Sequence, residues 1–126
     1  MERNMVGWFE IPVTDMERAK AFYAKVFGVE FESSEMGPSE LAMFPGLEGK
    51  PGAAGALIKG EEYHKPSLDG VQVFFTAHSG DLSNELARVR EAGGKVLKEK
   101  VSIGKYGFLA FFKDTEGNRL GLHSTK

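Results

Sequence analysis

Glu10 and His123 are the two residues of this sequence whose type and position are best suited to chemistry. Glu10 interrupts an apolar segment, residues 6–13. Alternation along a strand would place Phe9 and Ile11 on one side and Glu10 on the other. A carboxylate there is either hydrogen-bonded in a structural role, or able to act as a general base or to contact a ligand. His123 is either a rim residue near the C-terminus or a base, an anion donor or an unusual metal ligand.

A second group of residues could form the walls of a mixed apolar and polar pocket. Its aromatic members could stack on a planar or apolar ligand, and its polar members share their strand faces. These ligand-binding candidates are Trp8, Gln72, Phe74, Thr76, Phe108 and Arg119. The small residues Ala56 and Gly121 would leave room for that ligand, although isolated aromatic residues more often belong to a core. His64 and His78 fall in loop segments and are expected to be solvated.

Composition excludes several other kinds of site. The chain has no cysteine, which rules out disulfides, thiolate metal sites and a cysteine nucleophile, and which suits a reducing cytoplasm. The glycine-rich stretch 45–52 lacks the Lys-Ser/Thr of a phosphate-binding loop, and no Gly-x-Ser-x-Gly nucleophile elbow occurs. With a formal net charge of −2 and dispersed basic residues, we expect no nucleic-acid partner. No apolar stretch approaches the ~20 residues of a membrane span, so we expect no membrane partner and a cytoplasmic location.

In the first half of the chain, the elements that would position these residues are a strand, a helix and three short strands. The helix is expected over about 15–27, because apolar residues recur there at intervals of three and four. Thr14-Asp-Met-Glu17 matches a capping box at its start, and Gly28 suits its end. The following strands are expected at 29–32, 40–44 and 53–59.

The second half repeats this order. A strand at 71–77 precedes a helix at about 81–92 and strands at 95–102, 106–113 and 119–124, with a tight turn at Asp114-Thr-Glu-Gly117. The helix-ending Gly28 and Gly93 lie 65 residues apart, about half the chain, which indicates an internal duplication. The pattern therefore predicts one α+β domain, 1–126, built from two βαβββ modules at about 5–60 and 70–125.

Four stretches carry a resemblance to a known family. They are Trp-Phe-Glu-Ile-Pro-Val-Thr-Asp-Met-Glu-Arg-Ala at 8–19, Phe-Tyr-Ala-Lys-Val-Phe-Gly at 22–28, Ala-Gly-Gly-Lys-Val at 92–96 and Asp-Thr-Glu-Gly-Asn-Arg-Leu-Gly-Leu-His at 114–123. With the doubled βαβββ order, they resemble the vicinal oxygen chelate superfamily of glyoxalases, bleomycin resistance proteins and extradiol dioxygenases. The resemblance implies curved mixed sheets that form a cup with the helices outside, and a homodimer that binds a small molecule.

The resemblance also implies where a divalent metal would bind in metal-dependent members, which take one ligand from the first and one from the last strand of each module. By pattern, those positions are Trp8, Ala56, Gln72 and Gly121. Only Gln72 could bind a metal through its side chain, and a single neutral ligand does not hold a catalytic ion. We therefore assign no metal ligand at these positions and expect the chain not to be a standard lactoylglutathione lyase.

Three functional hypotheses remain. The first is a glyoxalase/bleomycin-resistance-like protein that binds a small molecule in the cup around Trp8, Glu10, Gln72, Phe74 and His123, whether or not it is catalytic. The second is a lyase, isomerase or dioxygenase with a divalent metal at a displaced site built on Glu10 and His123. The third is a ligand-free dimeric scaffold whose cup is filled by its own side chains. An open apolar and polar cavity would favour the first, and a closed cup the third.

Overall fold

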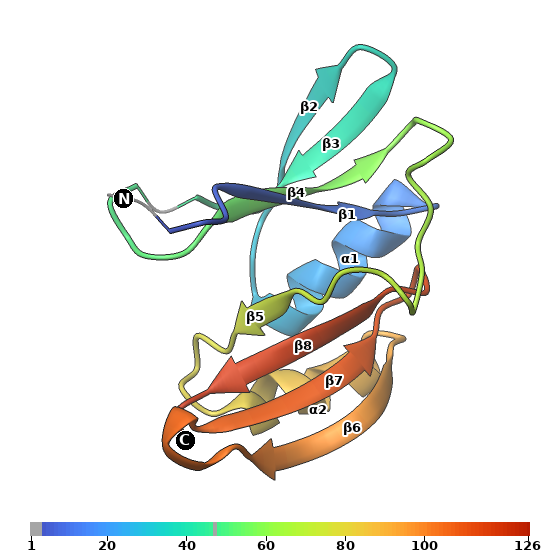
Figure 1. Ribbon diagram of the computed structural model, residues 1–126. Helices are drawn as coiled ribbons and strands as arrows, with labels where there is room; N and C mark the ends of the chain where they lie inside the picture. The colour runs from blue at the N-terminus through green and yellow to red at the C-terminus, as the bar shows by residue number, and fades with distance from the viewer. Residues whose placement is uncertain (1–3, 47) are drawn as a thin grey trace.

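The computed structural model describes residues 4–46 and 48–126, and Figure 1 shows its two open mixed sheets with two α-helices. The first sheet has the order β1-β4-β3-β2 and the second the order β5-β8-β7-β6. Their strands are β1 (Trp8–Pro12), β2 (Glu32–Met36), β3 (Ser39–Met43), β4 (Ala54–Lys59), β5 (Phe74–Thr76), β6 (Lys95–Ser102), β7 (Phe108–Lys113) and β8 (Arg119–Ser124). The helices are α1 (Met16–Phe27) and α2 (Leu82–Glu91), and a short 3₁₀ turn, η1, spans Gly104–Tyr106. This confirms the α+β fold of paired βαβββ modules.

The two modules are equivalent residue by residue around their parallel strand pairs. In the first module β1 runs parallel to β4, and in the second β5 runs parallel to β8. The amide of Val13 donates to the carbonyl of Ile58 at 2.9 Å, and the amide of Ala77 donates to that of His123 at 2.9 Å. The modules are thus offset by 64 residues in their first strands and 65 in their last. The alignment of Trp8 with Gln72, inferred from pattern, is confirmed.

Helix α1 lies where its apolar periodicity predicted, but its start is capped differently. Asp15, not Thr14, is the N-cap, and its Oδ1 accepts from the amide of Arg18 at 3.1 Å. The capping box is wrong, because the amides of Thr14 and Asp15 donate instead to Oε1 of Glu116, at 2.9 and 2.8 Å. Gly28 ends the helix at φ +66°, as expected of a left-handed C-cap.

Two predicted strands differ from the observed ones. The strand expected at 29–32 is wrong, since only Glu32 of that segment belongs to a strand, the exposed β2, and residues 29–31 connect α1 to it. The strand expected at 71–77 is shortened to β5, and Val71 is 93% exposed. Alternation alone extended this strand too far, because a strand needs a partner along its whole length and β5 pairs with β8 only over three residues.

The hydrophobic core lies between the helices and the sheets. Phe22, Tyr23, Val26, Leu86 and Val89, on the helix faces predicted to be buried, are at most 4% exposed. All five belong to one cluster that includes apolar residues of both sheets, which makes the modules a single packed unit.

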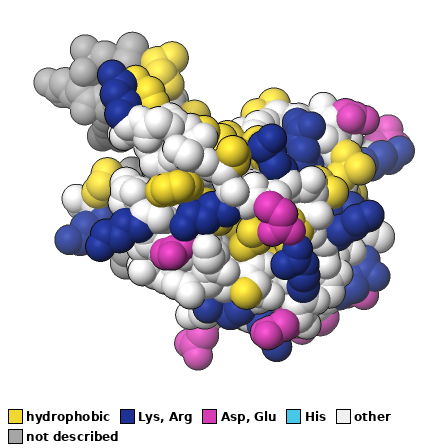
Figure 2. All heavy atoms as spheres, turned by 90° about the horizontal axis from the view of Figure 1, so that it is seen from below, with side chains coloured by type: hydrophobic (Ala, Val, Ile, Leu, Met, Phe, Trp, Pro, Cys, Tyr) yellow, Lys and Arg dark blue, Asp and Glu magenta, His cyan; other side chains and the backbone are white. Residues whose placement is uncertain are grey.

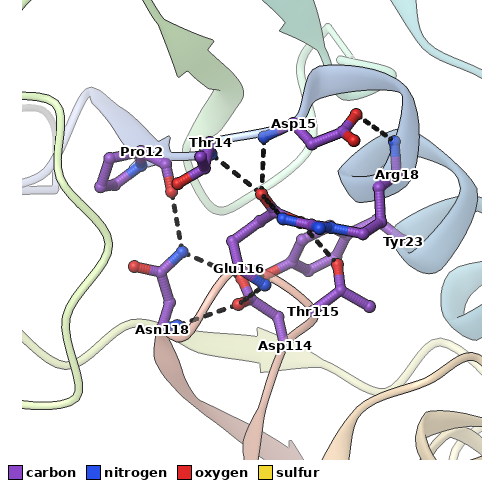
Figure 3. Close-up of polar contacts among 9 residues, drawn as sticks. All are labelled: Pro12, Thr14, Asp15, Arg18, Tyr23, Asp114, Thr115, Glu116 and Asn118. Atoms are coloured by element: carbon purple, nitrogen blue, oxygen red, sulfur yellow. Dashed lines mark hydrogen bonds and ion pairs between the residues drawn. The ribbon is translucent and has the colours of Figure 1, made fainter.

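A buried polar network ties the modules together beside this core (Figure 3). It centres on the turn between β7 and β8, where Oδ1 of Asp114 accepts from the amides of Glu116 and Asn118, at 2.8 and 2.9 Å. Oδ2 of Asp114 accepts from the Tyr23 hydroxyl at 2.7 Å, and Nδ2 of Asn118 donates to the Pro12 carbonyl at 2.8 Å. Burial, with the Asp114 carboxylate nearby, raises the pKa of Tyr23 well above its usual value, so Tyr23 remains a donor. The network anchors the end of β1 to the start of β8.

Candidate functional site

A cleft of about 1320 Å³ is lined by β1 and β5, which Figure 1 shows as the facing edges of the two sheets. Its apolar interior consists of half-buried rings from both modules. These rings are Phe9, Phe27, Phe44 and Phe75. The Phe9 and Phe75 rings meet edge to face with centroids 6.0 Å apart, so the two modules form the deep part of the cleft together.

Trp8 and Glu10 form the wall that belongs to β1. Indole Nε1 of Trp8 donates to Oε2 of Glu10 at 3.3 Å, and both side chains are solvent-exposed. Phe9 packs against the core on the opposite face of the strand. Glu10 thus lies on the side of β1 away from the core, as alternation predicted, and lines the cleft with the neighbouring Trp8 as its partner.

Gln72, Phe74 and Arg119 form the wall that belongs to the second module. Nε of Arg119 donates to Oε1 of Gln72 at 2.8 Å, and Nε2 of Gln72 donates to the carbonyl of Val73 at 3.2 Å. Thr76, at the end of β5, also lines the cleft. Five of the six ligand-binding candidates named from the sequence are thus brought together on two facing walls.

The small residues do not leave room for a ligand as expected. The Phe74 ring lies over Gly121, its cross-strand partner, so closely that a Cβ there would overlap the ring. Ala56 is fully buried in a small cluster with Leu41 and Ile58. Neither Ala56 nor Gly121 lines the cleft. The expectation is wrong, because neighbouring side chains of the chain itself occupy the space that these residues leave.

Phe108 and His123 lie outside the cleft. Phe108 packs against the core on the same side of β7 as Ala110 and Phe112. The expectation that it shares a strand face with Phe74 is wrong, because alternation along β7 places it on the opposite face. His123 does face away from the core, as predicted, while its neighbour Leu122 is buried in it. Its Nε2 lies 2.7 Å from the carbonyl oxygen of Tyr106, however, and it lines a separate hollow of about 440 Å³. Glu10 and His123 therefore do not share one pocket.

Sequence reasoning missed the residues that reach the cleft from connecting segments. Lys50, Lys65 and His78 line it from loops, and Phe44 follows β3 directly. His64 remains structural, since its Nδ1 accepts from the amide of Glu61 at 3.1 Å. No periodic pattern marks such loop residues, because their position depends on how the loops pack and not on the pleat of a strand.

The residues at the family's metal positions do not fit a divalent ion. Trp8, Ala56 and Gly121 offer no ligand atom, and the amide oxygen of Gln72 accepts from a guanidinium. The Arg119 guanidinium, whose Nε lies 2.8 Å from that oxygen, would repel a divalent ion bound to it. Among the described residues, no three His, Cys, Asp or Glu side chains are arranged to hold a metal, so Glu10 and His123 lack a third protein ligand.

The surface beneath the second sheet carries charges of both signs. On the face in Figure 2, Lys and Arg side chains are separated by acidic and apolar ones. This face thus shows no continuous basic patch of the kind that binds a phosphate backbone. Neither helix in the described part of the chain has the length and apolar content needed to cross a membrane.

Two βαβββ modules packed into one unit define a class of small α+β domains. The model of the Glyoxalase/Bleomycin resistance protein/Dioxygenase superfamily matches residues 5–122. A glyoxylase-like domain-containing protein of Didymella fabae is 32% identical over 119 residues, which cover 91% of this chain and 89% of that protein. The chain belongs to this superfamily.

Solved structures share the fold at lower identity. TnmS3, an antibiotic binding protein from Streptomyces sp. CB03234, has a TM-score of 0.71 and 22% identity, covering 100% of this chain and 99% of that one. Glyoxalase I from Zea mays has a TM-score of 0.70 and 20% identity, covering 94% of this chain and 45% of that longer one. The fosfomycin resistance protein FosX from Listeria monocytogenes has a TM-score of 0.67 and 17% identity, covering 100% and 94%. At these identities the likeness concerns the fold alone.

Proposed function

We propose that this protein binds a small molecule in the cleft between β1 and β5. The observation that carries the proposal is the cleft itself: it is large enough for a drug-sized ligand and combines an aromatic interior with a few polar groups. A ligand-free scaffold would fill the same space with its own side chains. The antibiotic binding protein TnmS3, which has the same fold, supports this choice.

The two walls would contribute aromatic surfaces and a hydrogen-bond acceptor to binding. Trp8 and Phe74, which are 45% and 46% exposed, offer aromatic faces on which a planar ligand can stack. Glu10, with one oxygen engaged by Trp8, offers its other oxygen as an acceptor. The metal-dependent alternative has no comparable support, because Glu10 and His123 line different hollows.

A titration of tryptophan fluorescence tests the proposal. Trp8 is the single tryptophan of the chain, so its emission reports on this cleft without background. We expect planar aromatic compounds from a diverse panel to quench or shift this emission with saturation. Native mass spectrometry of the purified protein would show whether a small molecule or a metal is carried along.

A matched pair of variants locates the binding. Phe74→Ala should weaken it about fivefold or more, because a stacked ring contributes ~1 kcal/mol or more. Leu97→Ala, on β6, removes a side chain of similar exposure (42%) outside the cleft and should change nothing. If no compound in the panel perturbs Trp8, or if both variants act alike, the cleft is not a binding site.

We also propose that the protein is a cytoplasmic homodimer. A chain without cysteine is suited to a reducing compartment, and the family resemblance favours a dimer. Sedimentation equilibrium would decide the second point: one species of 13.8 kDa across micromolar concentrations would contradict it.

A further inference from the structure

Arg119 is a half-buried cation in the cleft wall that is held by a neutral partner. Its Nε donates to Gln72, and the hydrogen bonds among the described residues use neither of its two terminal guanidinium nitrogens, while its backbone amide donates to the carbonyl of Ser67 at 3.4 Å. Within the described part of the chain, no carboxylate oxygen forms an ion pair with it. A partly desolvated guanidinium without a counterion favours an anion beside it.

The position of Arg119 directs this charge into the cleft. Arg119 begins β8, two residues before Gly121, and Gln72 lies in the segment that leads into β5. The hydrogen bond between the two side chains holds them side by side, and both residues line the cleft. The equivalent positions of the first module are Trp8 and Ala54, which pair across β1 and β4. The hydrogen-bonded pair of Arg119 and Gln72 therefore has no counterpart in the first module, where Glu10 is on the facing wall. A ligand would meet an aromatic face and a cation from the second module.

We propose that the ligand is an aromatic or otherwise apolar molecule with one anionic group, a carboxylate, sulfonate or phosphonate, which binds Arg119. This rests on the proposed function and adds the class of ligand. The planar guanidinium can place two parallel N–H donors on such a group, while Gln72 holds the side chain through Nε. The apolar part of the ligand would then pack against Phe74.

The cleft offers other charges that the test must separate from Arg119. Lys50 and Lys65 line it from exposed loops, and Glu10 and Glu48 are its carboxylates. A diffuse field from these groups would attract anions weakly and would depend little on any one residue. A specific site would depend on Arg119 and on the neutrality of Gln72.

Two fluorescent dyes make the comparison. Anilinonaphthalene sulfonate and phenylnaphthylamine have the same ring system, and only the first carries an anion. Both can be titrated into the native protein, and weaker binding of both dyes to Phe74→Ala would confirm that they bind at the cleft. We expect the sulfonate to bind about tenfold more tightly than the neutral dye, the size of one charge-assisted contact.

Three variants assign that preference. Arg119→Gln should weaken sulfonate binding about tenfold and leave neutral-dye binding within about twofold. Gln72→Glu is nearly isosteric and keeps Arg119 in place, but it supplies an internal counterion, so it should cause the same selective loss. Lys113→Gln is the control, because Lys113 pairs with Arg119 across β7 and β8 without lining the cleft. It should leave both affinities within about twofold.

The possible outcomes separate the two proposals. Binding of neither dye would contradict the proposed function. Equal binding of both dyes, with no effect of Arg119→Gln, would overturn the anion site and leave the proposed function standing. An equal loss in Lys113→Gln would mean a diffuse field and would also overturn the role of Arg119. If Arg119→Gln does not fold, as judged by circular dichroism, Gln72→Glu decides.

Discussion

The contact between Trp8 and Glu10 shows how a strand can contain a carboxylate that is neither buried nor bonded to the core. Glu10 is exposed and its indole donor comes from the same strand, two residues away. The hydrogen bond between these two exposed side chains involves no buried group. Glu10 is therefore free of structural side-chain contacts other than the one with Trp8.

This freedom predicts a small effect of Glu10→Gln on stability. The amide oxygen can still accept from Trp8, so we expect the free energy of unfolding to change by no more than about 0.5 kcal/mol. Loss of the carboxylate beside the indole should nevertheless shift Trp8 emission. Urea denaturation and emission spectra measure both effects, and a loss of several kcal/mol would return Glu10 to a structural role.

At the scale of the elements, Glu116 joins the β7–β8 turn to the start of α1. Its carboxylate accepts from the amides of Thr14 and Asp15 and from the Arg18 guanidinium, whose Nε lies 2.7 Å from Oε2. Burial opposes ionisation, but these hydrogen bonds outweigh it and lower the pKa of Glu116 to about 2. The first turn of α1 is thus held by a residue of the other module.

The lowered pKa predicts how Glu116→Gln depends on pH. Ionised Glu116 stabilises the fold fully above its unfolded pKa near 4.5, and this contribution is lost as the pH falls through about 2. We expect the variant to be less stable by about 1–2 kcal/mol at pH 7, because Arg18 is half exposed and its ion pair is screened. The difference from wild type should shrink between pH 4.5 and 2.

Urea denaturation at several pH values measures this difference. Glu17→Gln is the control, since Glu17 lies in the same helical turn with an exposed side chain. It should remain close to wild type at every pH. A Glu116→Gln defect that is equally large at pH 3 and pH 7 would contradict the ionic origin of the effect.

At the scale of the whole molecule, the cleft of this chain differs chemically from a metal-centred one. The two modules bring Trp8, Ala56, Gln72 and Gly121 to their equivalent positions, and Arg119 adds a cation beside Gln72. Shared architecture does not by itself imply shared chemistry.

We accordingly expect no lactoylglutathione lyase activity. Polarising the substrate oxygens of the methylglyoxal–glutathione hemithioacetal in that reaction needs an ion with several strong protein ligands. At the family's metal positions this chain offers only the amide of Gln72, which already accepts from Arg119. Turnover should equal that of buffer with added zinc, nickel or cobalt. Activity that is well above buffer and is abolished by a chelator would contradict this reading and favour a displaced site with Glu10.

The sequence by itself determined the features that depend on local periodicity and local backbone preference. Apolar spacing located both helices and their buried faces, alternation placed Glu10 and His123 away from the core, and Gly28 marked the end of α1. The spacing of these signals also revealed the duplicated module. Each of these features depends on residues within one or two turns of each other, or on a repeated local pattern.

Only the tertiary structure decided which side chains meet. Glu116 accepts from the amide of Thr14, before the start of α1, across 102 residues of sequence, and Arg119 donates to Gln72 across 47. The ring of Phe74 fills the space over Gly121. Such contacts depend on how the two modules and their loops pack, and no local period encodes that packing. For the same reason, the sequence named the residues of the two facing walls but neither the loop residues that line the cleft nor the hydrogen bond between Arg119 and Gln72.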